Sequence, residues 1–172
     1  MGFDTSPPEE HRRSVSLLVQ ENLRSPTKRD DRCSTLHLAS ASDHLKIAKL
    51  LIQRGANVDV FDEKEETPLY QAAGDGKFAI ACLLIDHGAN VHGADSNGRT
   101  VLHAASQGGH LGVVKLLLVR GADADVVDKA NKTAANLASA NSKAKVAKFI
   151  AKYKGNANLR KKLCSTTLDT AE

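Results

Sequence analysis

The stretch DSNGRTVLHAASQGGHLGVVKLLLVRGADADVV, which spans Asp95–Val127, decides the fold because it is one unit of a repeat. Three glycines, Gly55, Gly88 and Gly121, follow one another at steps of 33 residues. The same step relates residues at both ends of each unit: Asp62, Asp95 and Asp128; Thr67, Thr100 and Thr133; Leu36, Leu69 and Leu102. A period of this length is typical of proteins in which each unit packs only against its neighbours.

Two segments carry the most diagnostic residues of the unit. Thr67–Ala73 reads TPLYQAA and Thr100–Ala105 reads TVLHAA, and each is followed by a leucine-rich run that ends in Gly-Ala. These segments resemble the ankyrin repeat, and the resemblance covers residues 34 to about 154. It implies an all-α solenoid of stacked helix-turn-helix units with β-hairpin loops, comprising about four repeats and an N-terminal cap helix.

The repeat register divides the chain into seven segments. They are a flexible leader at 1–13, an N-terminal capping half-repeat at 14–33, repeats at 34–61, 62–94 and 95–127, a C-terminal capping repeat at 128–154, and a basic tail at 155–172. Ser34 and Thr67 are expected to cap helices, because their hydroxyl oxygens can accept the free amides of a first turn. The apolar spacing of Leu45–Ile52 predicts a short helix that is mostly buried between neighbours.

Composition and charge restrict the class of protein. Aromatic residues make up only 3% of the 172 residues, which suits a stack filled with Leu, Ile, Val and Ala. The three cysteines lie far apart without zinc-ligand spacing, which predicts neither a disulfide framework nor a metal site. No segment reads as a signal peptide or a membrane span. We therefore expect a monomeric intracellular protein of the cytoplasm and/or nucleus that binds no cofactor.

Catalytic motifs are missing from the sequence. It contains no phosphate-binding glycine loop, dinucleotide fingerprint or nucleophile elbow, so we predict that the chain is not an enzyme. His37 and His103 occupy the motif position whose imidazole, by the ankyrin resemblance, bonds within and between repeats. Tyr70 stands at the same position of the second repeat. Its hydroxyl could repeat the histidine bond, or its ring could project toward a ligand.

The resemblance also implies a concave surface, built from loop tips and inner helices, on which the residues between motif positions contact a partner. The candidates are Phe61, Glu63, Lys64, Glu66, Tyr70, Asp75, Ser96, Asn97, Arg99, Gln107, Lys129 and Lys132, with Asp30, Asp31, Cys33, Ala41, Ser42 and Gly74 at further positions of this surface. Phe61 is either an apolar anchor of the hot-spot type or packs locally against a neighbouring loop. The main hypothesis is a non-catalytic scaffold, an adaptor or stoichiometric inhibitor, that binds another protein.

Charge is unevenly distributed along the chain. Residues 34–94 contain five basic and eight acidic side chains, whereas residues 128–172 contain ten basic and three acidic ones. Glu63–Glu66 forms an acidic tip, and lysines follow two loops later, which favours a bipolar partner. The alternative hypothesis is a regulatory module that acts through its basic C-terminal cap, including Arg160–Lys162, on nucleic acid or an acidic partner. Nucleic acid is the less favoured of these, because no aromatic residues are interleaved with the cations.

Overall fold

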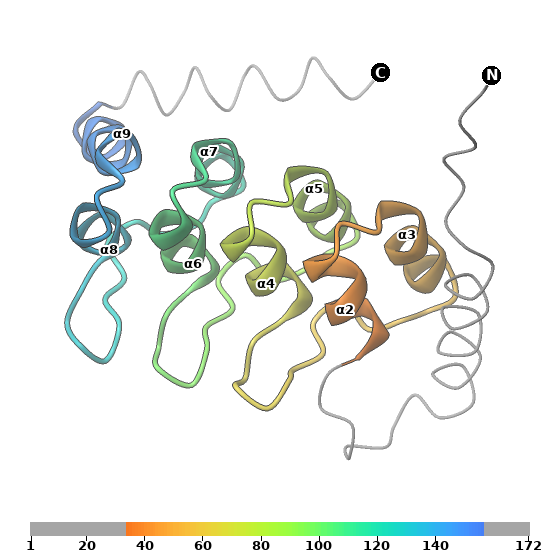
Figure 1. Cartoon of the computed structure of the whole chain (residues 1–172). Coiled ribbons are helices and arrows are strands. Elements are labelled where there is room, and N and C mark those ends of the chain that lie inside the picture. Colours follow the sequence, from red (N-terminus) through yellow and green to blue (C-terminus); the bar gives the residue numbers. More distant parts are fainter. Residues whose placement is uncertain (1–33, 157–172) are drawn as a thin grey trace, which may run out of the picture.

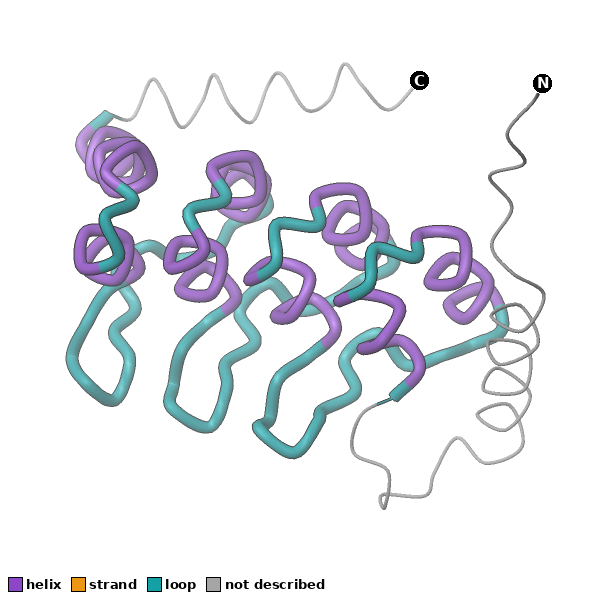
Figure 2. Tube along the Cα trace, in the orientation of Figure 1, coloured by secondary structure: helices purple, strands orange, loops and turns teal. Residues whose placement is uncertain are grey.

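The computed structural model describes residues 34–156, which form an all-helical solenoid of two layers (Figure 1). The inner layer contains α2 (Thr35–Ala41), α4 (Pro68–Gly74), α6 (Val101–Gly108) and α8 (Ala134–Ala140). The outer layer contains α3 (Leu45–Gln53), α5 (Phe78–Asp86), α7 (Leu111–Val119) and α9 (Ala144–Gly155). The long loops project from the inner layer, on the side opposite the outer helices (Figure 2). The predicted all-α solenoid is thus confirmed.

Several predicted segments lie outside the described residues. These are the leader at 1–13, the capping half-repeat at 14–33, and all but the first two residues of the basic tail at 155–172. None of the helices within residues 34–156 is long and apolar enough to cross a membrane.

Hydroxyl residues cap the starts of the inner helices. The amide of His37 donates to Ser34 Oγ at 3.4 Å, and the amide of Tyr70 donates to Thr67 Oγ1 at 3.2 Å. Pro68 follows Thr67 in the first turn of α4, where the missing amide hydrogen leaves no bond unmade. The predicted caps at Ser34 and Thr67 are therefore confirmed.

The core lies between the two layers and continues from repeat to repeat. Side chains that recur at the repeat step, such as Leu69 and Leu102 in the inner layer and Leu84 and Leu117 in the outer layer, are fully buried. Consecutive inner helices pack against one another, and so do consecutive outer helices. Stability in such a stack is approximately a sum of the repeats and their interfaces, so each interface holds its neighbours in place.

The outer helix α3 is less buried than its sequence predicted. Leu45 and Leu50 are 40% and 47% exposed, and the buried residues of this helix are Ala48 and Leu51. Within residues 34–156, α5 is the only outer helix that packs beside α3, so α3 cannot bury a second face against a described outer helix. The prediction that this helix is mostly buried between neighbours is therefore wrong for Leu45 and Leu50.

An aspartate organises the tip of each described loop. Asp62, Asp95 and Asp128 each accept the backbone amides of the residues two and four positions later, at 2.8–2.9 Å. Within residues 34–156, antiparallel β-bridges are limited to single ones between Ala94 and Thr100 and between Val127 and Thr133. Each aspartate amide also donates to the carbonyl four residues later at 2.9–3.0 Å, so the hairpin loops that the resemblance implied are tight turns held by a carboxylate and a backbone bond. The described residues contain no extended strand.

Candidate functional site

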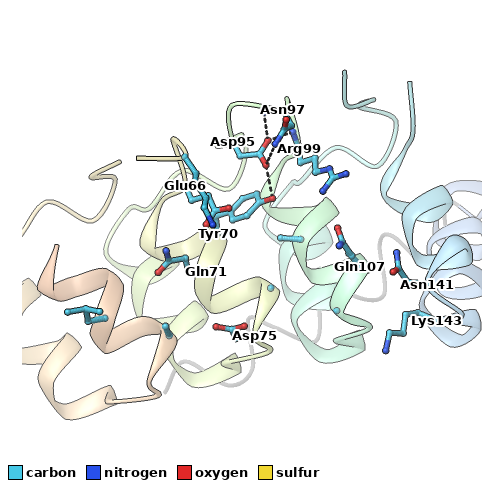
Figure 3. A pocket seen from close by; sticks show the side chains of 16 residues that line it. Glu66, Tyr70, Gln71, Asp75, Asp95, Asn97, Arg99, Gln107, Asn141 and Lys143 are labelled. Atoms are coloured by element: carbon cyan, nitrogen blue, oxygen red, sulfur yellow. Dashed lines mark hydrogen bonds between the residues drawn. The ribbon is translucent and has the colours of Figure 1, made fainter. Parts of the chain in front are cut away.

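An open groove of about 950 Å³ crosses the inner layer from α2 to the start of α9, at the base of the loops (Figure 3). Its lining residues come from four successive repeats: Leu38, Ala41, Lys64, Glu66, Tyr70, Gln71, Gly74, Asp75, Asp95, Asn97, Arg99, Ala104, Gln107, Gly108, Asn141 and Lys143. Small residues such as Gly74 and Ala104 alternate with polar and charged side chains. A surface of this kind can admit a peptide chain close to the helices and bond to its polar groups.

The structure brings together part of the predicted contact surface. Seven predicted residues line the groove: Lys64, Glu66, Tyr70, Asp75, Asn97, Arg99 and Gln107. Five others are exposed on the loops and do not line it: Phe61, Glu63, Ser96, Lys129 and Lys132. The Phe61 side chain is 57% exposed, so local packing does not bury it.

Further lining residues were not predicted. They are Leu38, Gln71, Asp95, Ala104, Gly108, Asn141 and Lys143. The repeat step contained a usable signal for one of them, because Asn141 lies two repeat lengths after the predicted Asp75. Of the further positions named from the sequence, Ala41 and Gly74 line the groove, Ser42 does not, and Asp30, Asp31 and Cys33 lie outside the described residues.

The two motif histidines hold the groove's framework in place. His103 Nδ1 lies 3.1 Å from the Thr100 amide and 2.8 Å from Thr100 Oγ1, while its Nε2 lies 3.0 Å from the Lys132 carbonyl oxygen. Because the amide donates to Nδ1, the proton of the neutral ring is on Nε2, which donates to the carbonyl. His37 makes the same bonds to Ser34 and to the Glu66 carbonyl. The structural role predicted for both histidines is confirmed.

Tyr70 departs from this pattern and shapes the groove. Its hydroxyl donates to Asp95 Oδ2 at 3.1 Å, so the bond goes to a loop carboxylate instead of a loop carbonyl (Figure 3). Burial, followed by the nearby negative charge of Asp95, raises the pKa of Tyr70 above its ordinary value, which keeps the hydroxyl protonated as a donor. The hydroxyl therefore bonds across repeats as the histidines do, but to a different acceptor, and the half-buried ring lines the groove. Its contact with a ligand stays a prediction.

Charges of both signs line the groove. The carboxylates are Glu66, Asp75 and Asp95, and the cations are Lys64, Arg99 and Lys143. Burial and then repulsion by Asp62 raise the pKa of Glu66, which means that keeping this carboxylate ionised costs free energy. Arg99 Nε lies 3.4 Å from Asp128 Oδ2, a carboxylate whose side chain is 2% exposed. Hydrogen bonding from the Lys132 amide is the main reason that the pKa of Asp128 is lowered.

Within residues 34–156, no cluster of three His, Cys, Asp or Glu side chains is arranged to hold a metal ion.

The buried imidazole of His37 gives the fold a pH dependence. Burial lowers the pKa of His37, so the folded protein keeps the ring neutral where the unfolded chain, with a pKa of about 6.5, takes up a proton. The contribution of His37 to the free energy of unfolding is fully present above the pKa of the unfolded state. It is lost as the pH falls toward the lower pKa of the folded state. We expect the midpoint of thermal unfolding to fall from pH 7.5 to pH 5.5, with a smaller fall in the His37→Gln variant.

The comparison with His37→Gln isolates this histidine from other titrating groups. Glu66 has the opposite effect, because a raised carboxyl pKa favours proton uptake by the folded state as pH falls. That contribution is present in both proteins and cancels to first order in the difference. Equal pH slopes for the parent and the variant would contradict the assignment to His37.

Comparison with known proteins places this architecture in a family. The family model for ankyrin repeats, which contains three copies, matches residues 9–95, 36–128 and 90–163, and these matches together cover most of the chain. A comparison with curated proteins finds no significant match. Ankyrin repeats are generally protein–protein interaction modules, and the family is typically a non-catalytic scaffold. The chain belongs to the ankyrin-repeat family.

Proposed function

We propose that the protein is a non-catalytic scaffold, an adaptor or stoichiometric inhibitor, that binds a partner protein in the groove of its inner layer. The observation that supports this best is the groove itself, which is continuous over residues of four successive repeats. The helices beneath it are fixed by a buried core and by the His37 and His103 bonds. A surface held in this way loses little conformational freedom on binding, and this lowers the cost of association.

The exposed loop residues extend the proposed contact beyond the groove. Phe61 and Glu63 are exposed in the loop before α4, Ser96 is exposed in the loop before α6, and Lys129 and Lys132 are exposed in the loop before α8. An aromatic side chain such as Phe61 is a suitable anchor when a partner covers it and excludes water. We also propose that the protein is monomeric and is found in the cytoplasm and/or nucleus. The free thiol of Cys82 suits a reducing compartment.

A matched pair of substitutions tests the groove. Gln107→Arg places a bulky cation in the groove on α6, whereas Gln53→Arg makes the identical chemical change on the outer helix α3, and both glutamines are exposed. We expect Gln107→Arg to weaken binding of a partner captured from native extract by about tenfold or more, because an unmatched charge and its bulk oppose docking. Gln53→Arg should bind like the parent, and affinity is measured by titration of the purified partner.

Either of two results would count against the groove. If both variants kept full affinity, the outer surface would be the better candidate, and the exposed lysines of α9 would be tested next by the salt dependence of binding. If both variants lost affinity equally, the effect would come from added charge in general. Circular dichroism and thermal unfolding of each variant show that binding is compared between folded proteins.

A further inference from the structure

The groove is polarised along its length. Glu66 and Asp75 lie at the second repeat, Arg99 belongs to the third, and Lys143 belongs to the fourth (Figure 3). The exposed loop residues continue the same order, because Glu63 and Glu65 precede α4 whereas Lys129 and Lys132 precede α8. One end of the surface therefore attracts cations and the other attracts anions.

At the acidic end, the Glu66 carboxylate forms no salt bridge with residues 34–156 and lies beside the Tyr70 ring (Figure 3). Glu66 is half-buried near Asp62, and the two carboxylates repel each other. Asp95 already accepts the Tyr70 hydroxyl and the amides of Asn97 and Arg99, so it has little capacity left for a ligand. Lys64 and a hydrogen bond with the Gln71 side chain favour the ionised form of Glu66, but Gln71 is neutral and the exposed Lys64 does not pair with Glu66 in a salt bridge. An ammonium or guanidinium group from a partner would pair with Glu66 and could contact the Tyr70 ring.

The cationic end has donors directed at the same groove. The Arg99 side chain is 35% exposed and uses Nε for Asp128, so the outer nitrogens of its guanidinium form no hydrogen bond with residues 34–156. Lys143 lies against Gly109, where an added Cβ would come within 2.6 Å of the lysine Cδ, so glycine makes room for its stem. A carboxylate is the ligand that suits both cations.

We propose that the groove takes an extended segment of a partner protein that carries a basic side chain for Glu66, at an end that Asp75 makes more negative, and acidic side chains for Arg99 and Lys143. This inference rests on the proposed function and specifies the chemistry of the partner. An extended chain suits the floor, because Ala41, Gly74, Ala104 and Gly108 leave room for a backbone near the helices.

The repeat geometry also sets the spacing of the charges. Neighbouring helices pack at about 8–10 Å, and an extended chain advances about 3.3 Å per residue, so one repeat corresponds to about three residues of the partner. The acidic side chains of the segment should therefore follow the basic one at about three residues for Arg99 and at about six or more for Lys143, because Lys143 follows the far end of α8 whereas Glu66 precedes the start of α4.

The test selects binders from a displayed library of random twelve-residue peptides on the full chain. We expect the selected peptides to combine a basic and an acidic residue at the stated spacing. The double variant E66K/D75K should bind such a peptide about tenfold more weakly or worse, because like charges then face each other. The control variant D86K/D123K changes net charge equally outside the groove and should bind it like the parent.

A charge-exchange experiment completes the test. Replacing the basic residue of the selected peptide by glutamate should restore binding to E66K/D75K and abolish binding to the parent. Two results would overturn the charge order but leave the groove as the binding site. In the first, the selected peptides carry charges of only one sign. In the second, the peptides bind E66K/D75K as tightly as the parent but bind Gln107→Arg more weakly. Peptides that bind Gln107→Arg as well as the parent, or a selection that enriches none, would overturn both proposals.

Discussion

Shortening Leu116 to alanine is expected to lower the free energy of unfolding by about 2–5 kcal/mol, because truncating a buried leucine removes apolar contacts and leaves a cavity. Leu116 lies on α7, is 8% exposed, and belongs to the core between the inner and outer layers. A loss of this size is a large fraction of the net stability of a small protein. Equilibrium unfolding in urea, monitored by circular dichroism, measures it.

The repeat supplies controls at the same register. Leu50 and Leu83 occupy the equivalent position in the two preceding repeats, where Leu50 is 47% exposed and Leu83 is partly buried against the core. Leu83→Ala should therefore cost less than Leu116→Ala, and Leu50→Ala should change stability by only about 0.5 kcal/mol, as is usual for surface sites. A Leu50→Ala cost equal to that of Leu116→Ala would contradict the exposure of the α3 surface.

Much of the fold could be predicted because the 33-residue step fixes which positions are equivalent. Ser34 and Thr67 were predicted as caps, and the structure confirms the bonds that they make. The burial of Leu45 and Leu50 was overestimated for a physical reason. Helical periodicity marks an apolar face but does not say whether a neighbouring helix covers it, and in a stack this depends on the position of the repeat.

The groove was only partly predictable. Lys64 and Gln107 were identified because they fall between motif positions of the repeat, but membership of a groove depends on curvature and side-chain direction. Lys129 and Lys132, at loop positions equivalent to Ser96 and Arg99, stand outside the groove although Arg99 lines it. Tyr70 shows the same limit, since its register predicted a bond but could not identify Asp95 as its acceptor.

Replacing His103 by alanine is expected to destabilise the protein by about 3–5 kcal/mol, through a core cavity and through buried polar groups left without partners. His103 is 1% exposed and connects α6 to the loop before α8. Its removal leaves the buried Thr100 amide without the acceptor that Nδ1 provides. The Lys132 carbonyl keeps its bond from the Asp128 amide, so the largest polar loss is at Thr100. Denaturant unfolding measures the total cost.

Asn136→Ala is the matched control, because Asn136 occupies the same register in the last described repeat and accepts the Thr133 amide at 3.0 Å. Asn136 is exposed, so water can replace the lost bond and the cost should be at most about 1 kcal/mol. Repeats in a stack contact only their neighbours, so His103→Ala should weaken the interface between α6 and α8 before it affects α4. Hydrogen exchange should then accelerate first in α8 and α9. A uniform acceleration over all described helices would mean that the His103 bonds stabilise the stack as a whole and not this interface in particular.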